Sequence, residues 1–495
     1  MMVDNCNILT QPDTHLQCDV AIVGSGPGGA VTAATLSEAG LDVLLIEEGD
    51  YLPLESCKPF SLDEMVQKYR NRGLTVAFGS PKVQYVEGRC VGGGSEVNSG
   101  LYYRTPSEVL ARWRDEYQVE GLSEEALEPH FLACEAAVSV SYLPTKPSLA
   151  SLKLQKGATQ LGWASHEVPR WFKYEPGLEP GDPPKGVKQS MTKTYIPRML
   201  KAGGRLLPNT RITSLKQTKG DREGHWTLRG QFRKETVSQA VSIVARTVFV
   251  AAGAVHTPAL LRRSGITHNV GNALQMHPTV KVIAQFDRRV SSEHLEVPVH
   301  QVKEFAPELS FGGSVSSLAY LQLAMVDYPE HATEVKQSWD KMATYYVSMA
   351  GSGRGSVRTL PGFADPLVRY HLPPSDLDKL AEGLKNLCQL LFAAGAEALF
   401  PLIPQGTRLT QEAEVACLRD HLPTDTNLMT IHLFSSCPMG ENRELCATDS
   451  FGKVHDKDNL YVADASLLCT ALGVNPQGSV MAIARRNALN FLKTR

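Results

Sequence analysis

Residues 18–50 read CDVAIVGSGPGGAVTAATLSEAGLDVLLIEEGD, and this stretch decides the fold. Its apolar run at 20–23 is typical of a buried parallel strand. A GxGxxG motif follows, formed by Gly24, Gly26 and Gly29. An alanine-rich segment and a second apolar run then lead to Glu47, about twenty residues beyond the glycines, as a dinucleotide-binding fingerprint requires. The order of strand, glycine turn, helix, strand and acid predicts a doubly wound α/β domain that binds a dinucleotide.

Each part of this pattern has a mechanical reason. Glycines allow the backbone to approach a pyrophosphate, which is stabilised at the positive end of the following helix. Glu47 can accept hydrogen bonds from a ribose diol, and its charge would repel a 2′-phosphate. This arrangement alone does not distinguish NAD from FAD.

Length and composition limit the remaining possibilities. At 495 residues the chain exceeds the usual size of one hydrophobic core, so we expect at least two domains. A net charge of -2 gives no reason to expect a nucleic-acid partner. No apolar run is long enough to span a bilayer, and the N-terminus does not read as a secretory signal. Ten cysteines without a CxxC pair argue against a zinc site, so we expect no metal and a cytoplasmic protein.

Four further stretches carry a resemblance to a known family. GRCVGGGSEVNSG (88–100) is too rich in glycine for a packed strand, and RTVFVAAGAVHTPALLRRSGI (246–266) runs from an apolar strand into a helix. IHLFSSCPMGEN (431–442) and NLYVADASLLCTALGVNPQGSVMAIARRNALNFL (459–492) follow near the C-terminus. With the GxGxxG motif, and in this order, they resemble the glucose-methanol-choline (GMC) family of FAD-dependent oxidoreductases, nearly from end to end.

The resemblance implies a set of FAD contacts. The ADP part would lie on the GxGxxG glycines and Glu47, and the remaining contacts would be Gly92, Gly93, Asn98, Ile212, Gly253, Ala254, Asp464, Ala465, Pro476 and Gln477. Some members link the flavin to a histidine just before the asparagine of the second motif. Val97 occupies that place, so we expect non-covalent FAD.

The resemblance also implies the catalytic pair. An active-site histidine that precedes a small-residue turn and Met-Gly corresponds to His432, and its partner corresponds to Asn475. We expect His421, His455 and His277 to be structural or surface residues. Many members have Asp-His-Pro where this chain reads Met-His-Pro at 276–278, so no role is predicted for that loop.

The implied reaction is oxidation of an alcohol to an aldehyde or ketone, by hydride transfer to flavin N5 with His432 as the base. A lyase or photodecarboxylase on the same scaffold, an NAD-dependent reductase, and a flavin-binding module without turnover remain open. The electron acceptor is oxygen, a quinone or another compound. The composition of 295–345 permits a moderately apolar substrate.

The same resemblance predicts how the chain is divided. Residues 1–140, 188–285 and 431–495 would form a discontinuous FAD-binding domain. Residues 141–187 and 286–430 would form an α+β substrate domain, with an antiparallel sheet laid over the flavin.

Overall fold

A seven-stranded sheet holds the dinucleotide-binding pattern. The computed structural model describes residues 7–10, 13–176, 185–218, 225–292 and 297–495. The sheet contains β1 (His15–Val23), β2 (Val43–Ile46), β9 (Arg205–Leu207), β10 (Thr210–Gln217), β11 (Trp226–Lys234), β12 (Val237–Val250) and β23 (Leu460–Val462). Its order is β10-β11-β12-β1-β2-β9, with β23 also paired to β12. The pairs that involve β1, β2, β9 and β23 are parallel, whereas β10, β11 and β12 form an antiparallel meander.

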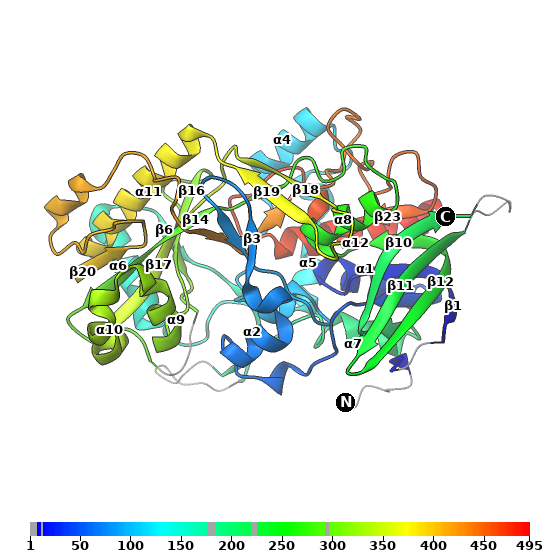
Figure 1. Ribbon diagram of the computed structural model, residues 1–495, viewed down its shortest axis with the longest axis horizontal. Coiled ribbons are helices and arrows are strands. Elements are labelled where there is room, and N and C mark those ends of the chain that lie inside the picture. Colours follow the sequence, from blue (N-terminus) through cyan, green and yellow to red (C-terminus); the bar gives the residue numbers. More distant parts are fainter. Residues whose placement is uncertain (1–6, 11–12, 177–184, 219–224, 293–296) are drawn as a thin grey trace.

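Helices cover one face of the parallel strands, and the meander lies over the other (Figure 1). The helical layer contains α1 (Pro27–Glu38), α5 (Glu124–Ala137), α7 (Tyr195–Lys201) and α12 (Gln477–Thr494). Side chains of β1 that alternate in direction enter two separate cores, with Ile22 on the helical side and Val23 on the side of the meander. α4 (Ser107–Tyr117) and α8 (Gly253–Arg263) complete the second core. The predicted doubly wound fold is confirmed.

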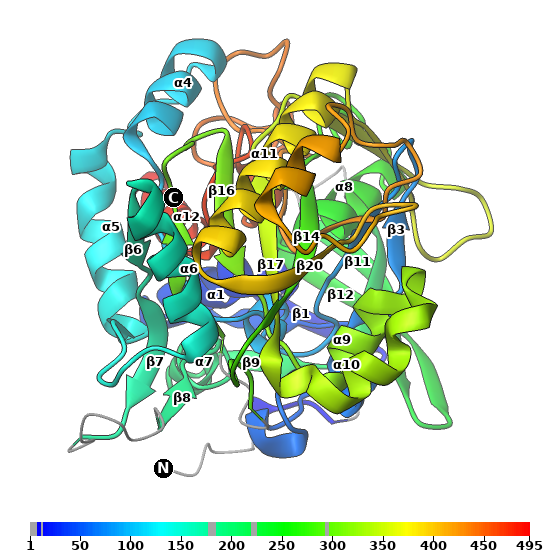
Figure 2. The ribbon, with the colours of Figure 1, turned by 90° about the vertical axis from the view of Figure 1, so that its left-hand side faces the viewer.

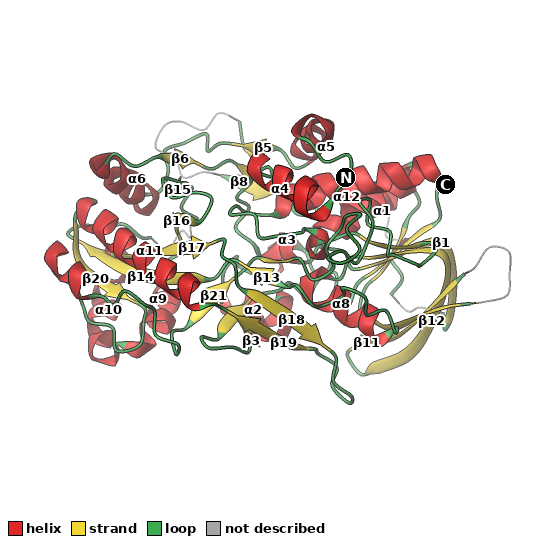
Figure 3. Ribbon diagram, turned by 90° about the horizontal axis from the view of Figure 1, so that it is seen from above, coloured by secondary structure: helices red, strands yellow, loops and turns green. Residues whose placement is uncertain are grey.

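A second, nine-stranded sheet forms the other half of the molecule (Figure 3). It contains β3 (Thr75–Ala77), β4 (Val83–Tyr85), β6 (Ser165–Glu167), β14 (Thr279–Phe286), β15 (His300–Val302), β16 (Leu309–Gly313), β17 (Met342–Met349), β20 (Ala396–Pro401) and β21 (Leu428–Thr430). All but one of its pairings are antiparallel, the exception being β21 with β4. The predicted antiparallel sheet is therefore present.

Helices cover this sheet unequally (Figure 2). One face packs against α6 (Leu149–Leu161) and α11 (Pro374–Ala393). α11 buries the leucines at 377, 380, 384, 387 and 391 that its sequence places on one side. The opposite face is covered at one end by α9 (Leu318–Ala324) and α10 (Ala332–Ser338), which pack on Ile283 and Phe400.

Shorter elements connect the two halves. They are α2 (Leu62–Lys68), α3 (Gly94–Val97), β5 (Val140–Ser141), β7 (Arg170–Tyr174), β8 (Gly186–Lys188), β13 (Gln275–Met276), β18 (Arg354–Arg358), β19 (Leu367–His371) and β22 (Leu433–Phe434). The 3-10 turns are η2 (Leu54–Ser56), η3 (Arg70–Gly73), η4 (Met325–Asp327), η5 (Pro329–His331), η6 (Trp339–Lys341), η7 (Glu412–Cys417) and η8 (Ala465–Leu467). Among the described residues, no helix combines the length and the apolar composition needed to cross a bilayer.

Candidate active site

The three motif glycines have different steric environments. A Cβ on Gly24 would lie 2.1 Å from the carbonyl oxygen of Ala251, and one on Gly29 would lie 2.0 Å from the carbonyl oxygen of Gly24. A Cβ on Gly26 would have no atom within 4 Å. Two of the glycines therefore serve close packing, whereas the middle one faces open space at the N-terminus of α1. This is the arrangement in which a backbone receives a pyrophosphate.

Glu47 lies at the end of β2, beside this turn. Its Oε2 accepts hydrogen bonds from the backbone N–H and the hydroxyl of Ser25, over 3.1 and 2.7 Å, and its Oε1 accepts one from the Gly49 N–H over 2.9 Å. Burial raises the pKa of Glu47, although these hydrogen bonds oppose the shift. The bonds fix the carboxylate and leave Oε1 with capacity for a further donor.

The next residue, Glu48, has a different environment. It forms ion pairs with Arg70, Arg89 and Arg211 at 2.8, 3.3 and 3.3 Å. Burial opposes ionisation, but the guanidinium groups of Arg70 and Arg211 lower the pKa of Glu48 to about 2. Glu48 is therefore committed to the protein, and Glu47 is the acid available to a nucleotide.

Several of the other predicted contacts meet around the same turn. The N–H of Gly92 donates to the hydroxyl of Ser25 over 3.0 Å, and a Cβ on Gly93 would lie 2.9 Å from Cα of Gly26. Asp464, at the end of β23, accepts from the N–H of Gly253 over 2.8 Å. Ala254 lies beside Gly253 in the first turn of α8, and Ala465 begins η8. Burial raises the pKa of Asp464, although the hydrogen bonds that it accepts oppose the shift.

Two other predicted FAD contacts, Asn98 and Gln477, are bonded to each other. Nδ2 of Asn98 donates to Oε1 of Gln477 over 2.7 Å, which joins the end of α3 to the start of α12. Pro476 caps that helix. Ile212 lies on β10 beside the nucleotide turn, because Thr210 donates its N–H to the Glu47 carbonyl over 2.7 Å. Val97 is buried, and its carbonyl accepts from the Tyr69 hydroxyl over 3.2 Å.

His432 lies against a second histidine. β13 and β22 pair Met276 with Leu433, so the residues that follow and precede them, His277 and His432, are adjacent. Their Nδ1 atoms are 3.0 Å apart. His277 is 3% exposed and is therefore a buried partner of His432, not a surface residue. The Met-His-Pro loop, for which no role was predicted, supplies this contact.

Asn475 lies on the other side of His432. Its Nδ2 is 3.5 Å from Nε2 of His432, and its Oδ1 is 3.4 Å from Nε2 of Gln301 on β15. The structure thus brings His432 and Asn475 together, and it adds His277 and Gln301, for which no role was predicted. His421 and His455 lie elsewhere, and His421 pairs with Asp378 at 2.6 Å.

Two hydrogen bonds to the histidine rings bear on which ring nitrogen of His432 carries the proton. The N–H of Gly473 donates to Nε2 of His277 over 3.0 Å, so neutral His277 carries its own proton on Nδ1. The Nδ1–H of His277 then donates a hydrogen bond to Nδ1 of His432, so the proton of His432 itself lies on Nε2. The longer contact from the Asn475 amide favours the opposite tautomer, in which Nε2 of His432 has a lone pair that accepts from Nδ2 of Asn475. The two contacts therefore favour opposite tautomers of His432: one satisfies the Gly473 N–H, and the other satisfies the Asn475 amide.

The rings are held neutral. Burial, together with the nearby ammonium of Lys303, lowers the pKa of His432 to about 4. Burial, His432 and Lys303 lower the pKa of His277 well below its ordinary value. A neutral imidazole that retains a lone pair can accept a proton from a hydroxyl group, whereas an imidazolium cannot.

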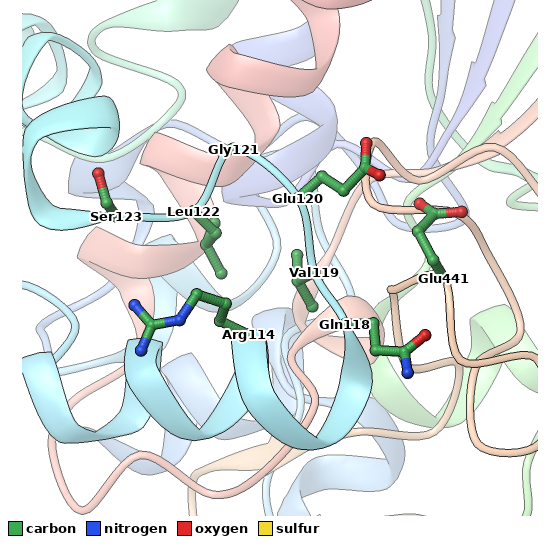
Figure 4. Close-up of a pocket in the computed structure, with 8 residues that line it drawn as sticks. All are labelled: Arg114, Gln118, Val119, Glu120, Gly121, Leu122, Ser123 and Glu441. Carbon is green, nitrogen blue, oxygen red and sulfur yellow. The ribbon is translucent and has the colours of Figure 1, made fainter.

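Figure 4 shows a separate surface hollow of about 530 Å³. It is lined by Arg114, Gln118, Val119, Glu120, Gly121, Leu122, Ser123 and Glu441. None of the predicted site residues lines it. The carboxylates of Glu120 and Glu441 in its wall also give it no feature of a dinucleotide site.

The comparisons with known proteins establish the family. Two family models described as GMC oxidoreductase match residues 63–279 and 352–484, and one described as an NAD(P)-binding Rossmann-like domain matches residues 22–55. An uncharacterised GMC-type oxidoreductase of Sinorhizobium fredii is 39% identical over 486 residues, which cover 96% of this chain and 95% of that protein. The chain therefore belongs to the GMC oxidoreductase family, whose members are generally FAD-dependent.

Relatives that are named for an activity are more distant. A long-chain-alcohol oxidase of Arabidopsis thaliana is 27% identical, over 99% of this chain and 70% of its own length. A cholesterol oxidase of Mycobacterium tuberculosis is 25% identical, over 95% and 90%. The crystal structure of pyridoxine 4-oxidase from Mesorbium loti has a TM-score of 0.70 and 20% identity, over 96% of this chain and 99% of that one, and it shows the shared fold.

Proposed function

We propose that this protein binds FAD non-covalently and oxidises a small-molecule alcohol to an aldehyde or ketone, with His432 as the base and Asn475 as its partner. The observation that carries the proposal is the contact between neutral His432 and Asn475, which join segments far apart in the sequence. These are the base and the hydrogen-bond donor that alcohol oxidation requires.

The residues around the glycine turn fit FAD. Gly26 leaves space for a pyrophosphate, and Glu47 is held with an oxygen available for a ribose. We propose that the segments around the seven-stranded sheet hold the cofactor, and that the nine-stranded sheet supplies the substrate side. When bound, FAD supplies the hydride acceptor. Val97 cannot form a histidyl link, which supports a dissociable cofactor.

The protein's own part in the reaction is the handling of the hydroxyl proton. Nε2 of His432 accepts that proton, and the Asn475 amide donates to the oxygen as negative charge develops. The accepting tautomer leaves the Gly473 N–H without its partner, and an unsatisfied buried donor costs about 1–3 kcal/mol. General base catalysis contributes about 10²–10⁴-fold in rate, or about 2.7–5.4 kcal/mol, so the base role outweighs this cost.

An anaerobic screen of alcohols tests the proposal. An alcohol that is a substrate should bleach the flavin absorbance in the dark and yield its aldehyde or ketone. Bleaching that requires light would favour a photodecarboxylase, and purified protein without flavin would favour an NAD-dependent reductase. A flavoprotein that no alcohol reduces would contradict the proposal. Reoxidation of the reduced flavin by oxygen or by a quinone would then identify the acceptor.

A further inference from the structure

Lys303 lies beside the catalytic pair and has no counter-charge among the residues that the structure describes. Its Nζ donates to the carbonyl of Gly473 over 3.0 Å and lies 5.1 Å from the ring centre of Tyr103. Among the described residues, no carboxylate shifts the pKa of Lys303, which is lowered by burial alone. The adjacent acid, Glu304, is exposed and accepts from the N–H of Ala164 over 2.9 Å. Within the described residues, Lys303 thus has one hydrogen-bond acceptor, the Gly473 carbonyl, for its three ammonium N–H donors.

The described side chains that share a side with Lys303 are polar and uncharged. Gln301 lies two residues earlier on β15 and contacts Asn475, so both residues point toward the same side of the strand. The Tyr103 hydroxyl donates to Oε1 of Gln301 over 3.0 Å and lies 2.7 Å from Nε2 of His166. Lys303 is thus part of a network of neutral hydrogen-bonding groups that reaches Asn475.

A partly buried ammonium without a counter-charge is costly, because burial disfavours its charge. Burial lowers the pKa of Lys303 to about 8, so the amine still carries its proton at neutral pH. An anion next to Lys303 would remove this cost and satisfy the unused donors. Gly473, whose carbonyl accepts from Lys303, also donates its N–H to Nε2 of His277, so the ammonium and the histidine pair lie on two sides of one residue.

Lys281 provides a matched comparison. It lies on β14, on the same side as Thr279, whose hydroxyl donates to the carbonyl of His277 over 3.0 Å. Burial also lowers the pKa of Lys281 to about 8. However, Lys281 does not contribute to the lowered pKa of His432, and it lies nearer the end of the sheet covered by α9.

We propose that Lys303 binds an anionic group of the substrate, and that the alcohol oxidised here carries a carboxylate or phosphate close to its carbinol carbon. This inference rests on the proposed function, since it names the substrate class of the same site. It departs from the moderately apolar substrate that the composition of 295–345 permits.

The test compares charged alcohols with neutral counterparts. ω-Hydroxy carboxylates of three to six carbons, their methyl esters and the matching ω-hydroxyalkyl phosphates would be mixed anaerobically with the FAD-loaded protein. The rate of flavin reduction and the substrate dissociation constant would be measured for wild type, Lys303→Met, Lys303→Arg and Lys281→Met. Propanoate to hexanoate, which cannot be oxidised as alcohols, would be titrated against the absorbance of oxidised flavin.

Wild type should bind one anionic series more tightly than the esters, and the preferred series distinguishes a carboxylate from a phosphate. Lys303→Met should raise the dissociation constants of that series about ten- to hundredfold, the range for a hydrogen bond to a charged group. The dissociation constants of the esters should stay the same. Lys303→Arg should restore the preference, and Lys281→Met should retain it. A wild type without an anionic preference would overturn the proposal, as would equal losses for acids and esters, or a preference that depends on Lys281.

The two proposals fail in different ways. If no alcohol reduces the flavin but carboxylates still perturb its spectrum in a Lys303-dependent way, the proposed reaction is wrong and the anion site stands. If neutral alcohols reduce the flavin at least as well as charged ones, the reaction stands and the anion site is wrong.

Discussion

Replacing Glu47 with alanine should weaken FAD binding by an amount that the structure allows us to estimate. The carboxylate is fixed by Ser25 and Gly49 and can accept from a ribose hydroxyl. A hydrogen bond to a charged group contributes about 1.5–3 kcal/mol, and its loss corresponds to a roughly 10- to 150-fold rise in the dissociation constant of FAD. Since Ser25 and Gly49 also lose their acceptor, the effect should lie toward the upper end.

The assay is titration of each apoprotein with FAD, followed by quenching of flavin fluorescence. Glu47→Gln keeps the shape and one oxygen acceptor, so its loss should be smaller than that of Glu47→Ala. The matched control is Glu48→Ala, which breaks the ion pairs with Arg70 and Arg211. It should lower the melting temperature, and it should weaken FAD binding less than Glu47→Ala does. An unchanged dissociation constant in Glu47→Ala, or a larger loss in Glu48→Ala, would refute the reasoning.

Three further results are expected. Gly26→Ala apoprotein should melt like wild type but bind FAD poorly, because its Cβ meets no protein atom and would occupy the space proposed for the pyrophosphate. Gly24→Ala should fail to fold, because its Cβ would lie 2.1 Å from the Ala251 carbonyl oxygen. Thermal melts and FAD titration of both variants check this contrast. Acid or heat should release intact FAD into the supernatant, because Val97 cannot form a covalent link, and yellow colour retained by the precipitate would contradict this. Flavin reduction should rise with pH around 4 and be level above about pH 6, because the pKa of His432 is lowered to about 4 and only neutral imidazole accepts a proton; a midpoint near 6.5 in stopped-flow rates would contradict the lowered value.

The dinucleotide fold could be predicted because its signals are local. The GxGxxG turn, the two apolar runs and Glu47 lie within 18–50, and each has a physical requirement that few residues satisfy. The single apolar face of α11 could likewise be read from the spacing of its leucines.

The neighbours of His432 could not be predicted, because long-range pairings bring them there. His277 meets His432 through β13 and β22, which are two residues each and too short to give a periodic pattern. Lys303 follows the three-residue strand β15 and reaches Gly473, 170 residues away in the chain. These contacts are seen only in the folded structure. The roles of the site residues stay predictions.

The central claim is that His432 removes the hydroxyl proton, and its most direct test is the anaerobic rate of flavin reduction in FAD-replete His432→Ala, with the best alcohol of the screen. The rate should fall by about two to four orders of magnitude and lose its dependence on pH around 4. Asn475→Ala should lose less, because it removes only a neutral donor. FAD content must be measured in each variant, since an empty site would mimic lost catalysis. An FAD-replete His432→Ala protein that reduces at the wild-type rate, with the same pH profile, would contradict the account.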